Sequence, residues 1–177
     1  AQIGNGGAGV RGASSGGVVV EAGTGGITMA GGTGSTSYAM IGSGGQGGQN
    51  GASGNVAATA AGGGISLEGG TGSNAFAMIG NGGNDASGDK SGDITVRATN
   101  GDVSLTGGGA ANNFAQIGNG GTFAAIAVNT FSGKVDVFAD RDIVLQGGAA
   151  DTAYVQIGHG GRRLSGSALS AVGGAVD

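Results

Sequence analysis

The 177-residue sequence contains no cysteine, no proline and no tryptophan, and only 10% of its residues are charged. The lack of cysteine excludes a disulfide framework and any thiolate metal site. The lack of proline, and of glycine at every third position, excludes a collagen triple helix. No apolar run approaches the roughly 18 to 20 residues of a membrane-spanning helix, so we expect no membrane span.

Basic residues are also scarce, with seven Lys and Arg against eleven Asp and Glu, and their only adjacent pair is Arg162-Arg163. Phosphate binding needs a clustered positive surface, so we expect no nucleic-acid partner. The first residues, AQIGNGG, lack the basic and apolar stretches of a signal peptide. They begin inside a repeated motif, without its aromatic residue, which predicts a piece of a longer protein.

What the sequence has in abundance is glycine, with 47 residues, and a motif of the form aromatic-x-x-Ile-Gly-x-Gly-Gly. Its isoleucines are Ile3, Ile41, Ile79, Ile117 and Ile157, spaced by 38, 38, 38 and 40 residues. A period of this length is typical of solenoids and related repeat folds. We therefore predict a single domain, 1–177, with repeats 1–37, 38–75, 76–113, 114–153 and an incomplete 154–177.

Within each repeat, apolar residues alternate with other residues in short runs. In SGDITVRATNGDVSLTGG (91–108), Ile94, Val96 and Ala98 share one parity, and Val103 and Leu105 share one parity in the next run. Period two indicates strands, and the motif supplies a third run. The predicted fold is all-β, a parallel β-helix (β-solenoid) with three strands per coil of roughly 38 residues. Two coils of 19 residues per repeat are the alternative.

The segment after each Gly-Gly pair varies in length, which is typical of a surface loop in a solenoid. One such segment, residues 122–131, is apolar and contains Phe123, Ile126, Val128 and Phe131. We expect it to fold back over a sheet.

A stripe of larger side chains has the opposite parity to the motif isoleucines. Its members are Tyr38, Met40, Phe76, Met78, Phe114, Gln116, Tyr154 and Gln156. Opposite parity places side chains on the opposite face of a strand, so we expect an outward stripe that could form a lateral contact between filaments or a sugar-stacking platform. The alternative is that the variable loops cover it.

One position of the motif turn carries polar side chains in every copy. These residues are Asn5, Ser43, Asn81, Asn119 and His159. Stacked Asn side chains share amide hydrogen bonds, and Asn tolerates tight turns. We therefore predict a structural turn ladder that includes His159, the single histidine of the chain.

Acidic residues offer two further candidates. Asp85 and Asp89, in GNGGNDASGD (80–89), are the only candidate calcium ligands, and the segment is a poor match to calcium-binding repeats. Asp136, Asp140, Arg141 and Asp142, with Arg97 one coil away, are candidates for a polysaccharide-acting site. Charged residues at a turn are usually only solvated, and we predict no enzyme. A nucleotide loop would need a helix after the glycines, and we predict no cofactor.

The strings SGDITVRATNGDVSLTGG, FAQIGNGG and YVQIGHGG resemble the repeat region of large exported bacterial adhesins of the filamentous haemagglutinin type. The resemblance covers essentially the whole chain and implies a right-handed β-helix, exported to the cell surface or secreted, acting in attachment, aggregation or a biofilm matrix. Its implied partners are neighbouring repeats, copies of itself, polysaccharide or host protein. The alternative is a fibre subunit that polymerises end to end.

Overall fold

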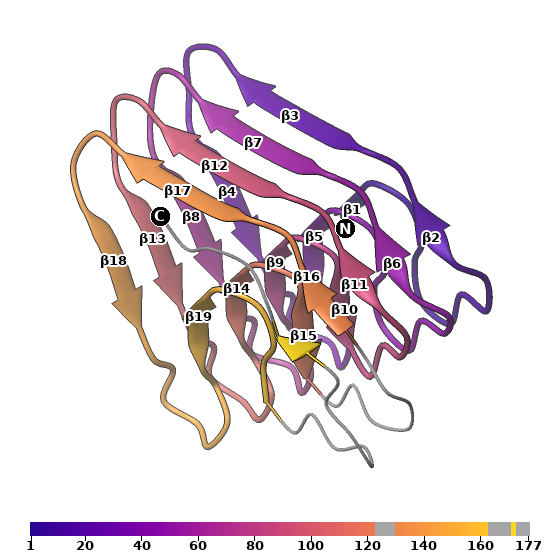
Figure 1. Ribbon diagram of the computed structural model, residues 1–177. Coiled ribbons are helices and arrows are strands. Elements are labelled where there is room, and N and C mark those ends of the chain that lie inside the picture. The colour runs from indigo at the N-terminus through magenta and orange to yellow at the C-terminus, as the bar shows by residue number, and fades with distance from the viewer. Residues whose placement is uncertain (123–129, 163–170, 173–177) are drawn as a thin grey trace.

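The computed structural model describes residues 1–122, 130–162 and 171–172, which form coils of parallel β-strands and no helix. Figure 1 shows the coils stacked one behind another along a single axis, from β1–β4 at one end to β17–β19 at the other. Among these residues, nothing helical could serve as a membrane span. The predicted β-solenoid is confirmed.

The motif strands pair with one another in sheet A. This sheet contains β1 (Gln2–Ile3), β5 (Ala39–Ile41), β9 (Ala77–Ile79), β14 (Ala115–Ile117) and β19 (Val155–Ile157). Ile41 pairs with Ile79, and Ile79 with Ile117. Each residue therefore lies beside its equivalent one full repeat away, so one repeat makes one coil and the alternative of two 19-residue coils is wrong.

The two alternating runs form sheets D and E. Sheet D contains β3 (Val18–Ala22), β7 (Val56–Ala60), β12 (Ile94–Ala98) and β17 (Val135–Ala139), and sheet E contains β4 (Ile27–Ala30), β8 (Ile65–Glu68), β13 (Val103–Thr106) and β18 (Ile143–Gln146). All three predicted runs are therefore strands, in parallel register.

Each coil also contains short strands that the sequence did not predict. Sheet C contains β2 (Ser14–Ser15), β6 (Ala52–Ser53), β11 (Lys90–Ser91), β16 (Thr130–Ser132) and β20 (Ala171–Val172), and sheet B contains β10 (Gly82–Asn84) and β15 (Gly120–Thr122). Three strands per coil is thus an incomplete description. Runs of two or three residues are too short to show a period, and their partners lie a whole coil away.

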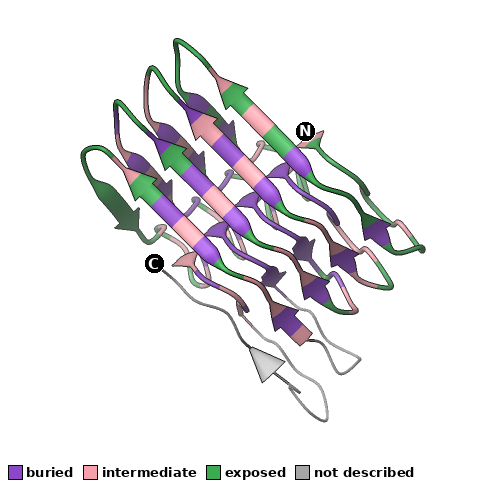
Figure 2. Cartoon of the chain, turned by 45° about the horizontal axis from the view of Figure 1, so that its top comes forward, coloured by how far each residue is buried: buried purple, intermediate pink, exposed green. Residues whose placement is uncertain are grey.

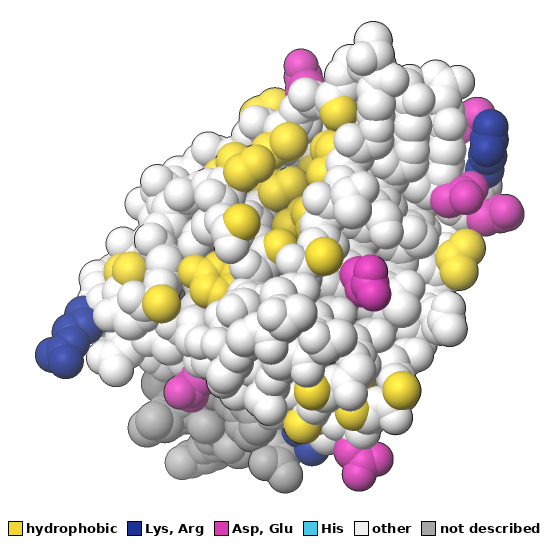
Figure 3. All heavy atoms as spheres, turned by 180° about the vertical axis from the view of Figure 1, so that it is seen from behind, with side chains coloured by type: hydrophobic (Ala, Val, Ile, Leu, Met, Phe, Trp, Pro, Cys, Tyr) yellow, Lys and Arg dark blue, Asp and Glu magenta, His cyan; other side chains and the backbone are white. Residues whose placement is uncertain are grey.

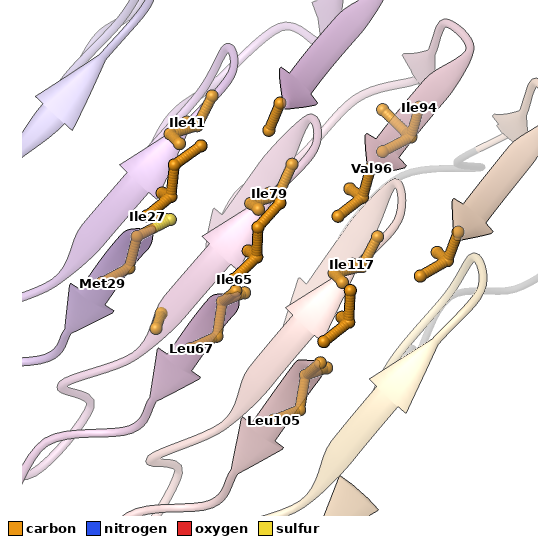
Figure 4. Close-up of a cluster of buried hydrophobic side chains, with 14 of the residues drawn as sticks. Ile27, Met29, Ile41, Ile65, Leu67, Ile79, Ile94, Val96, Leu105 and Ile117 are labelled. Atoms are coloured by element: carbon orange, nitrogen blue, oxygen red, sulfur yellow. The ribbon is translucent and has the colours of Figure 1, made fainter. Parts of the chain in front are cut away.

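The main core lies between sheets A, D and E. It contains the inward columns Val18-Val56-Ile94-Val135, Ile27-Ile65-Val103 and Ile41-Ile79-Ile117, among other apolar residues. Figure 4 shows core side chains such as Ile41, Ile79 and Ile117 stacked from coil to coil. Figure 2 shows buried positions alternating with intermediate or exposed ones along β7 and β12. Burial of each column depends on the coils above and below it.

Apolar side chains are less buried in the outer coils than in the inner coils. Leu67 and Leu105 are fully buried in sheet E, whereas Leu145, at the same register in β18, is 46% exposed. At the other end Ile3 is 53% exposed. The inner coils therefore supply the best-packed part of the structure.

Candidate functional site

The motif turn is built by glycines that no other residue could replace. Gly80 has a φ of +140°, and a Cβ there would lie 2.1 Å from the carbonyl oxygen of Gly118 in the next coil. Side chains disfavour this backbone region, and the close approach leaves no space for one. The chain can therefore turn back after each strand of sheet A while adjacent coils remain one strand spacing apart.

Inside this turn, the ladder residues bind one another and the neighbouring sheet. Asn119 Oδ1 accepts hydrogen bonds from the main-chain N–H of Asn81 and from its Nδ2, each at 3.1 Å. Asn119 Nδ2 in turn donates to the carbonyl oxygens of Gly92 (2.8 Å) and Ser132 (2.9 Å), beside sheet C. Each buried amide thus links two coils and joins the motif turn to a second part of the coil.

His159 takes the Asn place in the fifth copy of the motif. Its Nδ1 accepts a hydrogen bond from the main-chain N–H of Asn119 at 3.1 Å, and its Nε2 lies 2.9 Å from the carbonyl oxygen of Gly133. A main-chain N–H only donates and a carbonyl only accepts, so these partners assign a neutral ring with the proton on Nε2. The ring imitates an Asn side chain here and acts as a structural bridge.

The other two ladder residues differ in their surroundings. Ser43 is buried, and its main-chain N–H donates to Asn81 Oδ1 at 3.1 Å. Asn5, in the first coil, is exposed. The ladder is therefore strongest among the inner coils, where each member has a neighbour on both sides.

The predicted outward stripe is covered. Phe76 and Phe114 are fully buried, as is Met78, and Tyr38 and Tyr154 are half-buried. The four rings form one parallel column with centroid separations of 4.9, 4.7 and 5.1 Å. The interpretation as a free lateral contact is wrong for these rings, because sheet A is buried on both faces and the stripe forms a second core.

The cover is supplied by the chain that follows each motif turn. Gln116 Nε2 donates to the carbonyl oxygens of Gly158 (3.2 Å) and Gly160 (3.0 Å), and Thr122 Oγ1 donates to the Tyr154 hydroxyl at 3.2 Å. Gln156, in the same column, donates to the carbonyl of His159 at 2.7 Å. Burial raises the pKa of the Tyr154 hydroxyl to about 12. The motif turns and the strand that follows them therefore cover the stripe.

No local pattern of the sequence predicts a buried cation. Lys90 in β11 is fully buried, and its Nζ donates to the carbonyl oxygens of Ala86 (2.7 Å) and Gly88. Burial lowers the pKa of Lys90 to about 8, and the neighbouring Asp89 carboxylate offsets part of that shift. Its register partners are Ala52 and Phe131, so only the pairing places it inside. Lys90 holds the 86–88 segment against its own coil.

The calcium candidates do not form a cation site in the described residues. Asp85 and Asp89 are exposed, and Asp89 Oδ1 accepts a hydrogen bond from the main-chain N–H of Thr130 at 2.8 Å. Calcium takes six to eight oxygen ligands. Within the described ranges, no group of three or more His, Asp or Glu side chains could hold a metal ion.

Of the charged candidates, Arg97 and Asp136 lie in sheet D, and residues 140–142 form the turn between β17 and β18. Figure 3 shows acidic and basic side chains gathered at its upper right. Arg97 and Asp136 form an ion pair at 3.4 Å, while Asp140, Arg141 and Asp142 are exposed. Beside them is a groove of about 370 Å³, lined by Thr28, Ser66, Asn100, Asp102, Ser104 and Arg141 among others. The groove offers hydroxyl, amide, carboxylate and guanidinium groups, which suit hydrogen bonding to a polar ligand.

The predicted apolar loop is only partly described. Its residues Phe123, Ile126 and Val128 lie outside the described residues, whereas Phe131 is buried in β16.

Replacing Asn119 tests the ladder. Asn119→Ala removes its bonds to Asn81, Gly92 and Ser132 in a buried place, and we expect a loss of about 2–4 kcal/mol in the free energy of unfolding. Asn5→Ala, at the exposed end of the same ladder, should change it by less than about 0.5 kcal/mol. Urea unfolding followed by circular dichroism measures both, and equal losses would contradict the ladder.

The buried Lys90 predicts that the free energy of unfolding depends on pH. Its folded pKa of about 8 lies below the ordinary 10.5, so between these values the unfolded chain binds more protons and stability rises with pH. The slope is at most about 1.4 kcal/mol per pH unit. Above pH ~10 the raised pKa of Tyr154 acts in the opposite sense.

Urea unfolding of the unsubstituted chain and of Lys90→Met at pH values between about 8 and 9.5 measures this slope. The rise should disappear in Lys90→Met and remain in Lys134→Met, since Lys134 is exposed. The same rise in both variants would refute the assignment to Lys90.

In comparisons with known proteins, the chain matches no protein-family model, no curated protein sequence and no solved structure.

Proposed function

We propose that this chain is a structural repeat module of an extracellular adhesin or biofilm-matrix filament, acting as a rigid rod in attachment or aggregation. The observation that carries the proposal is the unbroken parallel register from coil to coil, such as Ile41 to Ile79 to Ile117. A stack of this kind lengthens by about 4.8 Å with each coil while its cross-section stays constant. It is suited to spacing a binding surface from a cell.

Rigidity of the rod has three sources in the structure. The strands of sheets A, C, D and E pair across successive coils. The Asn81–Asn119 bonds join coils within the turn, and the aromatic column packs them through a second core. Bending the rod would have to disturb all three in one place, so their combined effect favours a stiff module.

In this proposal partners bind the outer surface of the solenoid, because side chains fill both cores. The groove beside Arg141 presents the polar groups that recognise sugar hydroxyls. Cell-surface or matrix polysaccharide is therefore the partner class that we favour over host protein. The resemblance to haemagglutinin-type repeats and the secreted or cell-surface location that it implies remain part of the proposal.

Coil duplication tests the rod. Residues 76–113 begin and end at equivalent register positions, since Ala77 pairs with Ala115. Inserting three extra copies after residue 113 should lengthen the particle by about 15 Å at constant cross-section and raise its stability. Small-angle X-ray scattering and urea unfolding measure both, with scrambled copies of the same composition as the control. A longer chain with a wider or unfolded profile would refute the module.

A second candidate, a subunit that polymerises end to end, is favoured by the apolar end coils. Ile143 and Leu145 are 44% and 46% exposed at one end. At the other end is a cavity of about 350 Å³ lined by Ile3, Ile27 and Met29 among others, on the face where Figure 3 shows apolar side chains gathered. Contact between the two different ends of successive copies would be head-to-tail. A head-to-tail contact that does not close into a ring produces filaments.

Sedimentation over a concentration series separates the two candidates. A polymerising subunit should form filaments, and Leu145→Lys should abolish them, whereas Val19→Lys, on an exposed side face, should not. A monomer at all concentrations would exclude polymerisation of this chain and leave the rod proposal standing.

A further inference from the structure

The chain contains the dipeptide Asn-Gly five times, with Asn at positions 5, 50, 81, 100 and 119. In this dipeptide the glycine main-chain nitrogen can attack the side-chain amide carbon of Asn. A new C–N bond closes a succinimide ring, the bond to the side-chain nitrogen breaks, and that nitrogen takes up a proton in place of the one that the glycine nitrogen loses and leaves as ammonia. Water then opens the ring to aspartate or isoaspartate. Glycine favours the attack because it has no Cβ to hinder the approach of its nitrogen. Asn is accordingly counted among the thermolabile residues.

The two buried ladder positions are protected from this reaction. The attacking nitrogens are engaged, since Gly82 N–H donates to the Ser43 carbonyl at 2.9 Å and Gly120 N–H to the Asn81 carbonyl at 2.8 Å. The Asn119 amide also makes four hydrogen bonds, two through Oδ1 and two through Nδ2. Ring closure there would break all of them inside the fold.

Asn50 is an intermediate case. Its side chain is exposed, but Gly51 N–H donates to the carbonyl of Ser87 at 3.1 Å. Its amide Nδ2 donates to the carbonyl of Arg11. The attacking nitrogen must leave a main-chain bond before it can react.

Asn100 is exposed in the turn between β12 and β13, on the corner between sheets D and E, whereas the following Gly101 is buried. Its side chain makes a single hydrogen bond, from Nδ2 to the carbonyl of Ala61 at 2.6 Å. Among the described residues, Gly101 N–H donates to no main-chain carbonyl. We propose that Asn100-Gly101 is a site of spontaneous succinimide formation and deamidation, while the same dipeptide in the inner ladder is protected.

The product would alter one corner of the solenoid. It places a new carboxylate beside Asp102, whose Oδ1 accepts the main-chain N–H of Asp142 at 3.1 Å, in a chain whose formal charge is already −4. The product also lacks the amide that donates to the carbonyl of Ala61, one of the links to the preceding coil. An isoaspartate further adds one carbon to the main chain of the turn. The groove lined by Asn100 and Asp102 would thereby become more acidic.

Peptide mapping by mass spectrometry tests the proposal. The folded chain is aged in mildly alkaline buffer made with ¹⁸O-labelled water, and label incorporation is measured at each Asn. We expect Asn100 to react at least ~10-fold faster than Asn81 and Asn119. Asn5, exposed in the first coil with a Gly6 N–H that makes no main-chain bond in the described residues, should also react.

The same experiment in urea provides the matched control, because all five dipeptides have the same two residues. The five rates should converge there if the fold sets the difference. Asn100→Gln should remove the label at 100 and leave the rates at 81 and 119 unchanged. Equal rates at Asn100 and Asn119 in the folded chain, or an unreacted Asn100 beside a reacted Asn119, would overturn the proposal.

Discussion

The structure depends on parallel, in-register pairing of each residue with its equivalent in the next coil. Ile65, for example, lies between Ile27 and Val103 in sheet E, and each adjacent pair is fixed by the strand ladder. Parallel strands are about 4.8 Å apart, so every column of side chains inherits that spacing. The aromatic rings, at 4.7 to 5.1 Å, stack because the backbone places them there.

This spacing explains why glycine is so frequent. Where coils meet at the motif turn, the main chain of one lies against the main chain of the next, and a Cβ at Gly80 or Gly118 would overlap a carbonyl oxygen. The turn can then fold back over sheet A and enclose the second core. Glycine thus allows a small coil to bury both faces of one sheet. The Asn side chains of the ladder supply hydrogen-bond partners for main-chain groups that this arrangement buries.

The same geometry limits where function can lie. Both cores are filled, the imidazole of His159 is occupied by two main-chain partners, and the buried ammonium of Lys90 is occupied by two carbonyls. What remains for recognition is the outer surface of sheets D and E and their charged corner. A rod whose inside is structural and whose outside is variable is consistent with the role that we propose.

The sequence by itself determined the repeat and the inward faces of the first and second runs, because period and parity are local properties of a strand. Only the strand pairing decided that one repeat makes one coil. It also determined that the ladder residues share one place in the turn. The tertiary structure alone decided that Phe76 and Phe114 are buried, that Lys90 lies inside, and that sheets B and C exist. Parity can place a side chain on a face, but whether that face is covered depends on chain that returns from another part of the coil. The two-residue strands likewise exist only because a partner lies one coil away, which no local pattern records.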